Sequence, residues 1–134
     1  MRISRQADYA VRVALDLADC HEARIKDIAL RQHLSPAYVG RISQRLAQTG
    51  VLVNTRGRLG RLRLACPPDQ ISLLDIIEAV DGPMRIDRCL LAPSECGLES
   101  TCSVYGVGQE VLLQALAKLR SITLAQMVAR RPSQ

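Results

Sequence analysis

The sequence predicts a fold that is mainly α with a small β-hairpin, and three observations support this prediction. Apolar residues recur at helical spacing in several separate stretches. A serine followed by a proline starts one of these stretches, and a glycine ends it. Two segments rich in β-type residues flank a glycine-containing turn. Helix, helix, capped helix and hairpin is the order of a winged helix-turn-helix, and a long C-terminal dimerisation helix is expected after it.

Three helices are expected in the first third of the chain. One spans Ser4 to Cys20, and a shorter one spans Lys26 to His33. The third has Ser35 as its N-cap and Pro36 at its first helical position, and it stops at Gly50. The apolar stripe of the first helix consists of Tyr9, Ala10, Val13, Ala14, Leu17 and Ala18.

A hairpin and a fourth helix are expected next. The segments VLVNTR and RLRLAC flank Gly57-Arg58-Leu59-Gly60, which carries the turn glycines. The stretch ISLLDIIEAVDGP has helical periodicity and ends near Gly82. We therefore assign residues 1–83 to a winged helix-turn-helix domain.

The remaining residues divide into a predicted cysteine-containing loop at 84–103 and a dimerisation helix with a C-terminal tail at 104–134. The helix has a wide apolar stripe that the small preceding domain could hardly cover alone. Packing within its own subunit is the alternative interpretation. The stripe comprises Val104, Val107, Val111, Leu112, Ala115, Leu116 and Leu119, and a short final helix is expected at Ile122 to Ala129.

The composition favours one compact domain with an additional element: the chain has 134 residues, of which 48% are hydrophobic. No window approaches the roughly 18 apolar residues of a membrane span, and the first residues show no signal-peptide pattern. We therefore expect a cytoplasmic protein that does not contact membranes. Five cysteines in a reducing compartment favour metal binding or redox sensing over a disulfide framework.

The charge is concentrated in one part of the chain. Between Ile28 and Pro68 there are seven arginines and no Asp or Glu, whereas the whole chain has a net charge of +5. Such a block can simply be a solvated surface. The more specific interpretation is a surface that binds a polyanion such as double-stranded DNA.

The third helix is the predicted reading element. Its apolar side, with Val39, Ile42 and Leu46, leaves a basic and amide-rich side exposed. An α-helix fits the major groove, where arginine pairs with guanine and glutamine with adenine. The predicted DNA-binding residues are Tyr38, Arg41, Gln44 and Arg45 on this helix, and Arg56, Arg58, Arg61 and Arg63 on the hairpin, where they would reach phosphates or a narrow minor groove. A dimer would present two such helices to half-sites about 34 Å apart, which predicts an imperfect palindrome as the operator.

Three cysteines lie close together in the sequence: six residues separate Cys89 from Cys96, and five separate Cys96 from Cys102. A loop of this length can bend three thiolates around one centre. An iron–sulfur cluster, zinc, a thiol switch and inert cysteines all remain open at this point, although structural zinc normally has four ligands with shorter spacing. Cys20 and Cys66 fit neither motif, and we expect both to be buried small hydrophobic residues.

Nearly the whole chain resembles the Rrf family of winged-helix iron–sulfur regulators. The matching stretches are RISRQADYAVRVALDLA, SPAYVGRISQRLAQTGVL, TRGRLGRLRLA, ISLLDIIEAVDGP and the three cysteines. The resemblance implies a homodimeric transcriptional regulator whose operator affinity depends on an iron–sulfur cluster. It also implies that Cys89, Cys96 and Cys102 are cluster ligands and that Arg56 enters the minor groove.

The fourth ligand distinguishes branches of this family. The cluster-assembly regulator has a histidine where this chain has Tyr105. The nitric-oxide-sensitive repressor takes an aspartate from the first helix of the partner subunit, and this chain has Asp8 there. The resemblance is therefore closer to that branch, which favours a 4Fe-4S cluster over 2Fe-2S. A simpler interpretation is that Asp8 stabilises the helix N-terminus and pairs with Arg12.

Two parts of the chain depart from the family pattern. In the family, the wing usually has glycines and often an aromatic residue after the turn, whereas this chain has Leu59, Arg61 and Leu62. Gly40 also replaces a bulkier side chain on the third helix, so the operator sequence cannot be transferred.

The sequence thus predicts a repressor that senses nitric oxide, redox state or iron. The alternative is a cluster-free regulator of the same fold, controlled by cysteine oxidation or by a protein partner. A cluster-carrying redox protein is less favoured because such carriers generally have four cysteines and need no arginine-rich hairpin. No catalytic triad, Walker loop or dinucleotide motif is present, so an enzyme is not expected.

Overall fold

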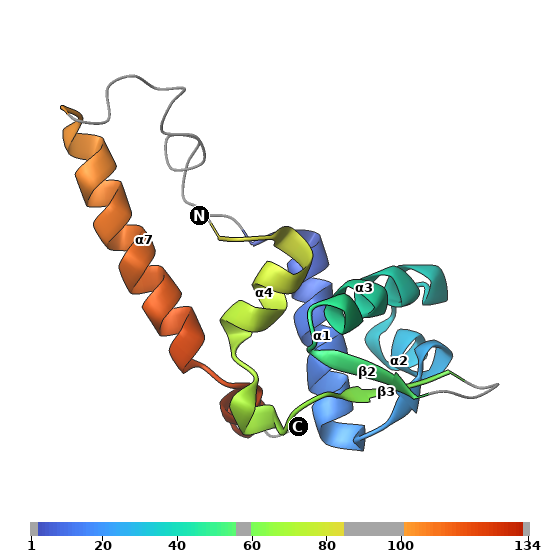
Figure 1. Ribbon diagram of the computed structural model, residues 1–134. Coiled ribbons are helices and arrows are strands. Elements are labelled where there is room, and N and C mark those ends of the chain that lie inside the picture. Colours follow the sequence, from blue (N-terminus) through green and yellow to red (C-terminus); the bar gives the residue numbers. More distant parts are fainter. Residues whose placement is uncertain (1–2, 56–59, 85–100, 133–134) are drawn as a thin grey trace.

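The computed structural model describes residues 3–55, 60–84 and 101–132, and it confirms a mainly helical fold with a small antiparallel sheet (Figure 1). The elements in chain order are α1 (Arg5–Cys20), β1 (Ala23–Arg24), α2 (Ile25–Gln32), α3 (Pro36–Gln48), β2 (Leu52–Thr55), β3 (Arg61–Leu64), the 3-10 turn η1 (Pro68–Gln70), α4 (Leu73–Asp81), α7 (Ser103–Ser121) and α8 (Leu124–Ala129).

Helix α1 forms the centre of the fold. It begins at Ser4, whose hydroxyl accepts a 3.1 Å hydrogen bond from the backbone N–H of Ala7. The helix contacts α3, α4 and α8, and Figure 1 shows it between α4 and the α2–α3 pair. Small residues on its inward side allow these helices to approach closely. That side comprises Ala7, Ala10, Val13, Ala14 and Leu17, each at most 1% exposed.

Helices α2 and α3 form the predicted helix-turn-helix. Helix α2 ends at His33, which adopts a left-handed conformation with φ of 56°. The Ser35 hydroxyl then caps α3 by accepting from the N–H of Tyr38, and Pro36 occupies the first helical position as predicted. Gly50 has φ of 81°, which a residue with a side chain rarely adopts, and this explains the stop after α3.

The sheet has three strands in the order β1-β3-β2, all antiparallel. The hairpin of β2 and β3 was predicted, whereas β1 was not. Strand β1 has only two residues, Ala23 and Arg24, which pair with Leu62 and Arg61. A strand this short has no periodicity of its own, so only its pairing with β3 defines it.

Two backbone hydrogen bonds, which we call the backbone clasp, join the start of α4 to the start of α8. Each helix starts with a capping box, formed by Ser72 with Asp75 and by Thr123 with Gln126. Between the two caps, the N–H of Leu73 donates to the Ile122 carbonyl at 2.8 Å, and the N–H of Leu124 donates to the Ile71 carbonyl at 2.9 Å. The side chain of Leu124 is fully buried against the core. The C-terminal helix is thereby fastened to the domain that contains α1.

Helix α7 extends away from the rest of the subunit over much of its length (Figure 1). Leu112 is its one buried residue, and α7 contacts α4. Val104, Val107 and Val111 are 75%, 60% and 52% exposed. The structure therefore leaves part of the predicted apolar stripe uncovered by the rest of the described chain.

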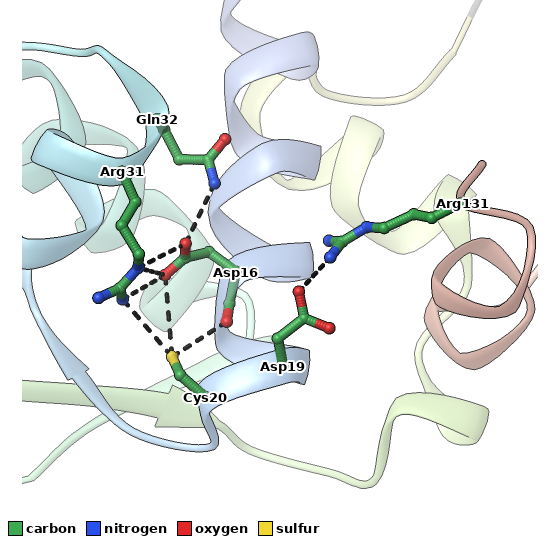
Figure 2. A network of polar contacts seen from close by, with 6 residues as sticks. All are labelled: Asp16, Asp19, Cys20, Arg31, Gln32 and Arg131. Carbon is green, nitrogen blue, oxygen red and sulfur yellow. Dashed lines mark hydrogen bonds and ion pairs between the residues drawn. The ribbon is translucent and has the colours of Figure 1, made fainter. Parts of the chain in front are cut away.

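A polar network around the buried carboxylate of Asp16 connects α1 to α2 (Figure 2). The Asp16 carboxylate, 6% exposed, accepts hydrogen bonds from Arg31 at 2.6 and 2.9 Å and from Gln32 at 3.1 Å. Burial alone would raise the pKa of Asp16, but the hydrogen bonds from Arg31 and Gln32 and the charge of Arg31 outweigh it and lower that pKa. One turn on, Asp19 pairs with Arg131 beyond α8, so α1 is held on two sides.

Within the part of the chain that the structure describes, no helix has the length and apolar character needed to cross a membrane.

We predict that Asp16→Asn lowers the free energy of unfolding at neutral pH by about 1.5–3 kcal/mol, the range for a hydrogen bond to a charged group. Because the pKa of Asp16 is lower in the folded than in the unfolded state, its stabilisation is complete above the ordinary value of 3.8 and is lost as the pH falls through the folded-state pKa. Urea unfolding followed by circular dichroism should show the two proteins converging below pH 3.8.

Asp19→Asn is the matched control. It breaks an ion pair whose two partners are each 43% exposed, and the expected loss is at most about 1 kcal/mol. Equal losses in the two variants at neutral pH would contradict the role given to Asp16.

Candidate nucleic-acid interface and cysteine site

The exposed side of α3 forms a shallow hollow of about 330 Å³. It brings together the four residues that the sequence predicted on this helix, Tyr38, Arg41, Gln44 and Arg45. None of the lining residues is acidic, so no carboxylate there would repel a phosphate. The lining also contains Ile42, Gln48 and, from α1, Gln6. Gln6 was not predicted, because its place beside α3 depends on the packing of two helices that are distant in sequence.

Two tyrosines connect α1 to α3 beside this hollow. The rings of Tyr9 and Tyr38 meet edge to face, with centroids 5.4 Å apart. The guanidinium of Arg41 lies 5.1 Å from the centre of the Tyr38 ring, and that of Arg12 lies 5.4 Å from the Tyr9 ring. Arg41 is thus exposed but held against an aromatic face, which reduces the conformational entropy that it would lose on binding.

Arg45 has different contacts, although it lines the same hollow. Its Nη1 donates to the carbonyl of Val80 at 2.8 Å and to Oε1 of Gln6 at 3.2 Å. The side chain therefore bonds to α4 and α1 of its own chain.

On the hairpin, Arg61 and Arg63 both lie exposed on the same side of β3. Arg61 lies 3.6 Å from the carboxylate of Glu22, whereas Arg63 lines a hollow of about 540 Å³ that also includes His21 and Cys66. Arg56 and Arg58, which were predicted to bind DNA, lie outside the described residues.

Of the three clustered cysteines, the structure describes Cys102, and Cys89 and Cys96 lie outside the described residues. Cys102 is partly exposed, has a free thiol and is the N-cap residue of α7. The N-terminus of a helix carries partial positive charge and favours an anionic group. Among the described residues, no three His, Cys, Asp or Glu side chains converge as a metal site would require.

Asp8 lies in the first turn of α1 and forms an ion pair of 3.1 Å with Arg12, as the simpler interpretation of the sequence predicted. The two side chains are 53% and 47% exposed. Exposed ion pairs contribute about 0–1 kcal/mol, so Asp8 could exchange this partner for another at little cost. Tyr105, at the position of the histidine in the other branch, accepts a hydrogen bond from Gln109 within α7.

The expectation that Cys20 and Cys66 are buried is wrong, because both residues are exposed. Each lies at the end of an apolar element, where the chain turns into solvent. The sulfur of Cys20 still contacts the polar network around Asp16: its thiol donates to the Asp16 carbonyl oxygen at 3.0 Å. Partial burial and the negative charge of Asp16 raise the pKa of this thiol.

Comparison with known proteins identifies the same family as the sequence motifs. Residues 3–130 match the Rrf2 family, described as an iron-dependent transcriptional regulator. An HTH-type transcriptional regulator from Haemophilus influenzae is 31% identical over 98% of this chain and 89% of its own length. The HTH-type transcriptional regulator NsrR of Bacillus subtilis is 29% identical over 98% of this chain and 92% of its own.

A solved structure has the same fold. IscR from T. potens superposes with a TM-score of 0.76 and 27% identity, and the match covers 100% of this chain and 94% of the IscR chain. The matched proteins are transcriptional regulators and not enzymes, which confirms the expectation from the sequence. The chain belongs to the Rrf2 family of DNA-binding transcriptional regulators.

Proposed function

We propose that this regulator is a cytoplasmic homodimer that represses transcription from an imperfect palindromic operator, and that an iron–sulfur cluster controls its affinity for that operator. DNA binding is assigned to residues 1–83, cluster binding to residues 84–103 and dimerisation mainly to the helix within residues 104–134. The observation that carries the proposal is the exposed side of α3, which combines Arg41, Gln44 and Tyr38 in a hollow without acidic residues.

The chemistry of α3 fits the major groove. Arg41 can donate to two acceptors of guanine, and Gln44 can pair with adenine. The hairpin arginines, Arg61 and Arg63 together with Arg56 and Arg58, would contact the backbone or the minor groove.

The second copy of the chain is proposed to pack on α7. Three exposed valines at helical spacing on a helix that extends from the body form an apolar surface that a monomer would leave in water. Pairing of two α7 helices would also place two α3 helices on one duplex, as half-sites about 34 Å apart require.

The proposed cluster ligands are Cys89, Cys96 and Cys102 of one subunit and Asp8 of the other. Cys102 fits this role because it is a free, partly exposed cysteine at the positive end of α7, and its side chain makes no capping hydrogen bond. Asp8 fits because its only bond to a described side chain is an exposed pair with Arg12. A 4Fe-4S cluster held by three soft thiolates and one carboxylate oxygen would supply one iron that is open to nitric oxide or oxygen.

The alternative is a cluster-free regulator in which a cysteine thiol is oxidised. Cys20 is poorly suited to that role, because its raised pKa keeps the thiol protonated and thiolates are the reactive form. The iron-dependent description of the matched family also supports the cluster.

Anaerobic purification tests the cluster. We expect a brown protein that contains iron and acid-labile sulfide, and we expect Cys102→Ser to lose both while the dimer still forms. Cys66→Ser is the matched control and should retain the cluster. A colourless wild-type protein with the same operator affinity would favour the cluster-free alternative.

Asp8→Ala should alter cluster stability or the response to nitric oxide without changing the folding of the cluster-free dimer. Unchanged visible spectra and an unchanged response would remove Asp8 from the ligand set.

Arg41→Gln tests the role of α3. It should weaken binding to the operator by about 1–3 kcal/mol and relax the preference at one base pair. Arg130→Gln removes the same charge from an exposed position after α8 and should leave the base preference unchanged. Fluorescence anisotropy with single-base operator variants measures both effects, and equal behaviour of the two variants would contradict a reading role for Arg41.

Val107→Asp tests the dimer. A carboxylate in an apolar interface costs several kcal/mol, so the dimer should dissociate at least about tenfold more readily in sedimentation experiments. Ala117→Asp introduces the same charge at an exposed position on a different side of α7 and should dissociate like the wild type. A dimer that is unaffected by Val107→Asp would place the interface elsewhere.

A further inference from the structure

The contacts of Arg45 separate it from the other residues of the α3 hollow. We propose that Arg45 is a positioning residue, which fixes α3 against the end of α4 and does not contact DNA. The inference rests on the proposed function to the extent that α3 is taken as the reading helix.

Arg45 connects three helices through one nitrogen atom. Its Nη1 donates to the Val80 carbonyl at 2.8 Å and to Oε1 of Gln6 at 3.2 Å. These partners are 35 and 39 residues away in the sequence and belong to α4 and α1. A guanidinium held in this way is directed toward the subunit, although its position on α3 is on the exposed side.

The Val80 carbonyl is stabilised by a hydrogen-bond donor from outside its own helix. It lies in the last turn of α4, where carbonyl groups have no N–H partner within the helix. The C-terminus of a helix also carries partial negative charge, which a cation stabilises. Helix α4 has no basic residue in its own last turn, so Arg45 supplies the missing cation and donor from α3.

The same end of α4 is tied to two further points. The Asp81 carboxylate accepts from the backbone N–H of Ser4 at 3.3 Å and from the Ser4 hydroxyl. The N–H of Met84 donates to the Glu78 carboxylate at 3.1 Å. The cysteine-bearing stretch follows directly in the sequence. A displacement at the end of α4 would therefore reach α3 through Arg45.

Arg41 is the contrasting case on the same helix. Its guanidinium lies over the Tyr38 ring, and it forms no hydrogen bond or ion pair with another of the described residues. Arg41 can therefore turn to DNA without breaking a hydrogen bond within the protein. If Arg45 turned to DNA, the Val80 carbonyl at the end of α4 would lose its hydrogen-bond donor.

Arg45→Gln and Arg41→Gln in the full chain distinguish the two roles. The probes are a duplex selected by the wild type from a random pool, its single-base variants and a scrambled duplex, each measured at several salt concentrations. Arg45→Gln should weaken binding to the selected duplex about tenfold or more, the scale of one hydrogen bond to a charged group. The affinity of Arg45→Gln for the scrambled duplex, and the salt dependence of its DNA binding, should match those of the wild type. Its preference for the selected bases should weaken at several base pairs together.

Two results would overturn the inference. A salt slope that decreases in magnitude by about 0.9 on both duplexes would show that Arg45 neutralises a phosphate. A loss confined to one base pair would show that it reads a base. Arg45→Lys keeps a cation and a donor, so it should recover most of the affinity with wild-type base preferences. It also provides the test if Arg45→Gln does not fold.

Amide hydrogen exchange measures the coupling between α3 and the end of α4 that Arg45 is proposed to provide. Binding of the selected duplex should slow exchange at residues 80–84 in the wild type but not in Arg45→Gln, because coupling between two sites is reciprocal. Equal protection in both proteins would contradict the link. If Arg41→Gln bound DNA like the wild type, the proposed reading role of α3 would be wrong. The contact between Arg45 and the end of α4 would still be testable, because amide exchange at residues 80–84 in the absence of DNA should be faster in Arg45→Gln than in the wild type.

Discussion

The close packing of other helices on α1 is the constraint on which the rest of the structure depends. The inward side of α1 is built mainly from alanine and valine, so α3, α4 and α8 can all approach the same helix. Larger residues there would separate these helices, and the exposed side of α3 would lose its orientation. The orientation of α3, the proposed reading helix, is therefore set by small residues that are buried in the core.

Individual side-chain and backbone contacts then hold α2, α3 and α8 in place around this core. Asp16 holds α2 through Arg31 and Gln32, and the Tyr9–Tyr38 contact holds α3. The backbone clasp at Ser72 and Thr123 joins the start of α8 to the start of α4. A buried carboxylate is costly unless it is paired, so the contacts of Asp16 specify the arrangement of α1 and α2 more strongly than apolar packing alone. These contacts place α3 and α7 so that one side of each helix is exposed.

The arginines between Ile28 and Pro68 thus have different contacts, although the charge pattern of the sequence does not distinguish one from another. Arg31 is committed to Asp16, Arg45 to the end of α4, and Arg61 lies close to Glu22. Arg41 lies on an aromatic ring in the hollow and has no such partner among the described residues. Net charge therefore predicts that a chain attracts DNA, but internal pairing decides which cations are available for it.

The sequence by itself determined the helices and their ends, because caps such as Ser35 with Pro36 and stops such as Gly50 act through neighbouring residues. It also determined which side of α3 is exposed and which apolar residues of α7 could face a partner. The tertiary structure alone decided the strand β1, the clasp of α8, the place of Gln6 beside α3, the exposure of Cys20 and Cys66, and the internal bonds of Arg45. The hydrogen-bonded contacts in this list join residues that are far apart in the chain. All of these features depend on which elements the core brings together. Local propensity and periodicity do not contain that information.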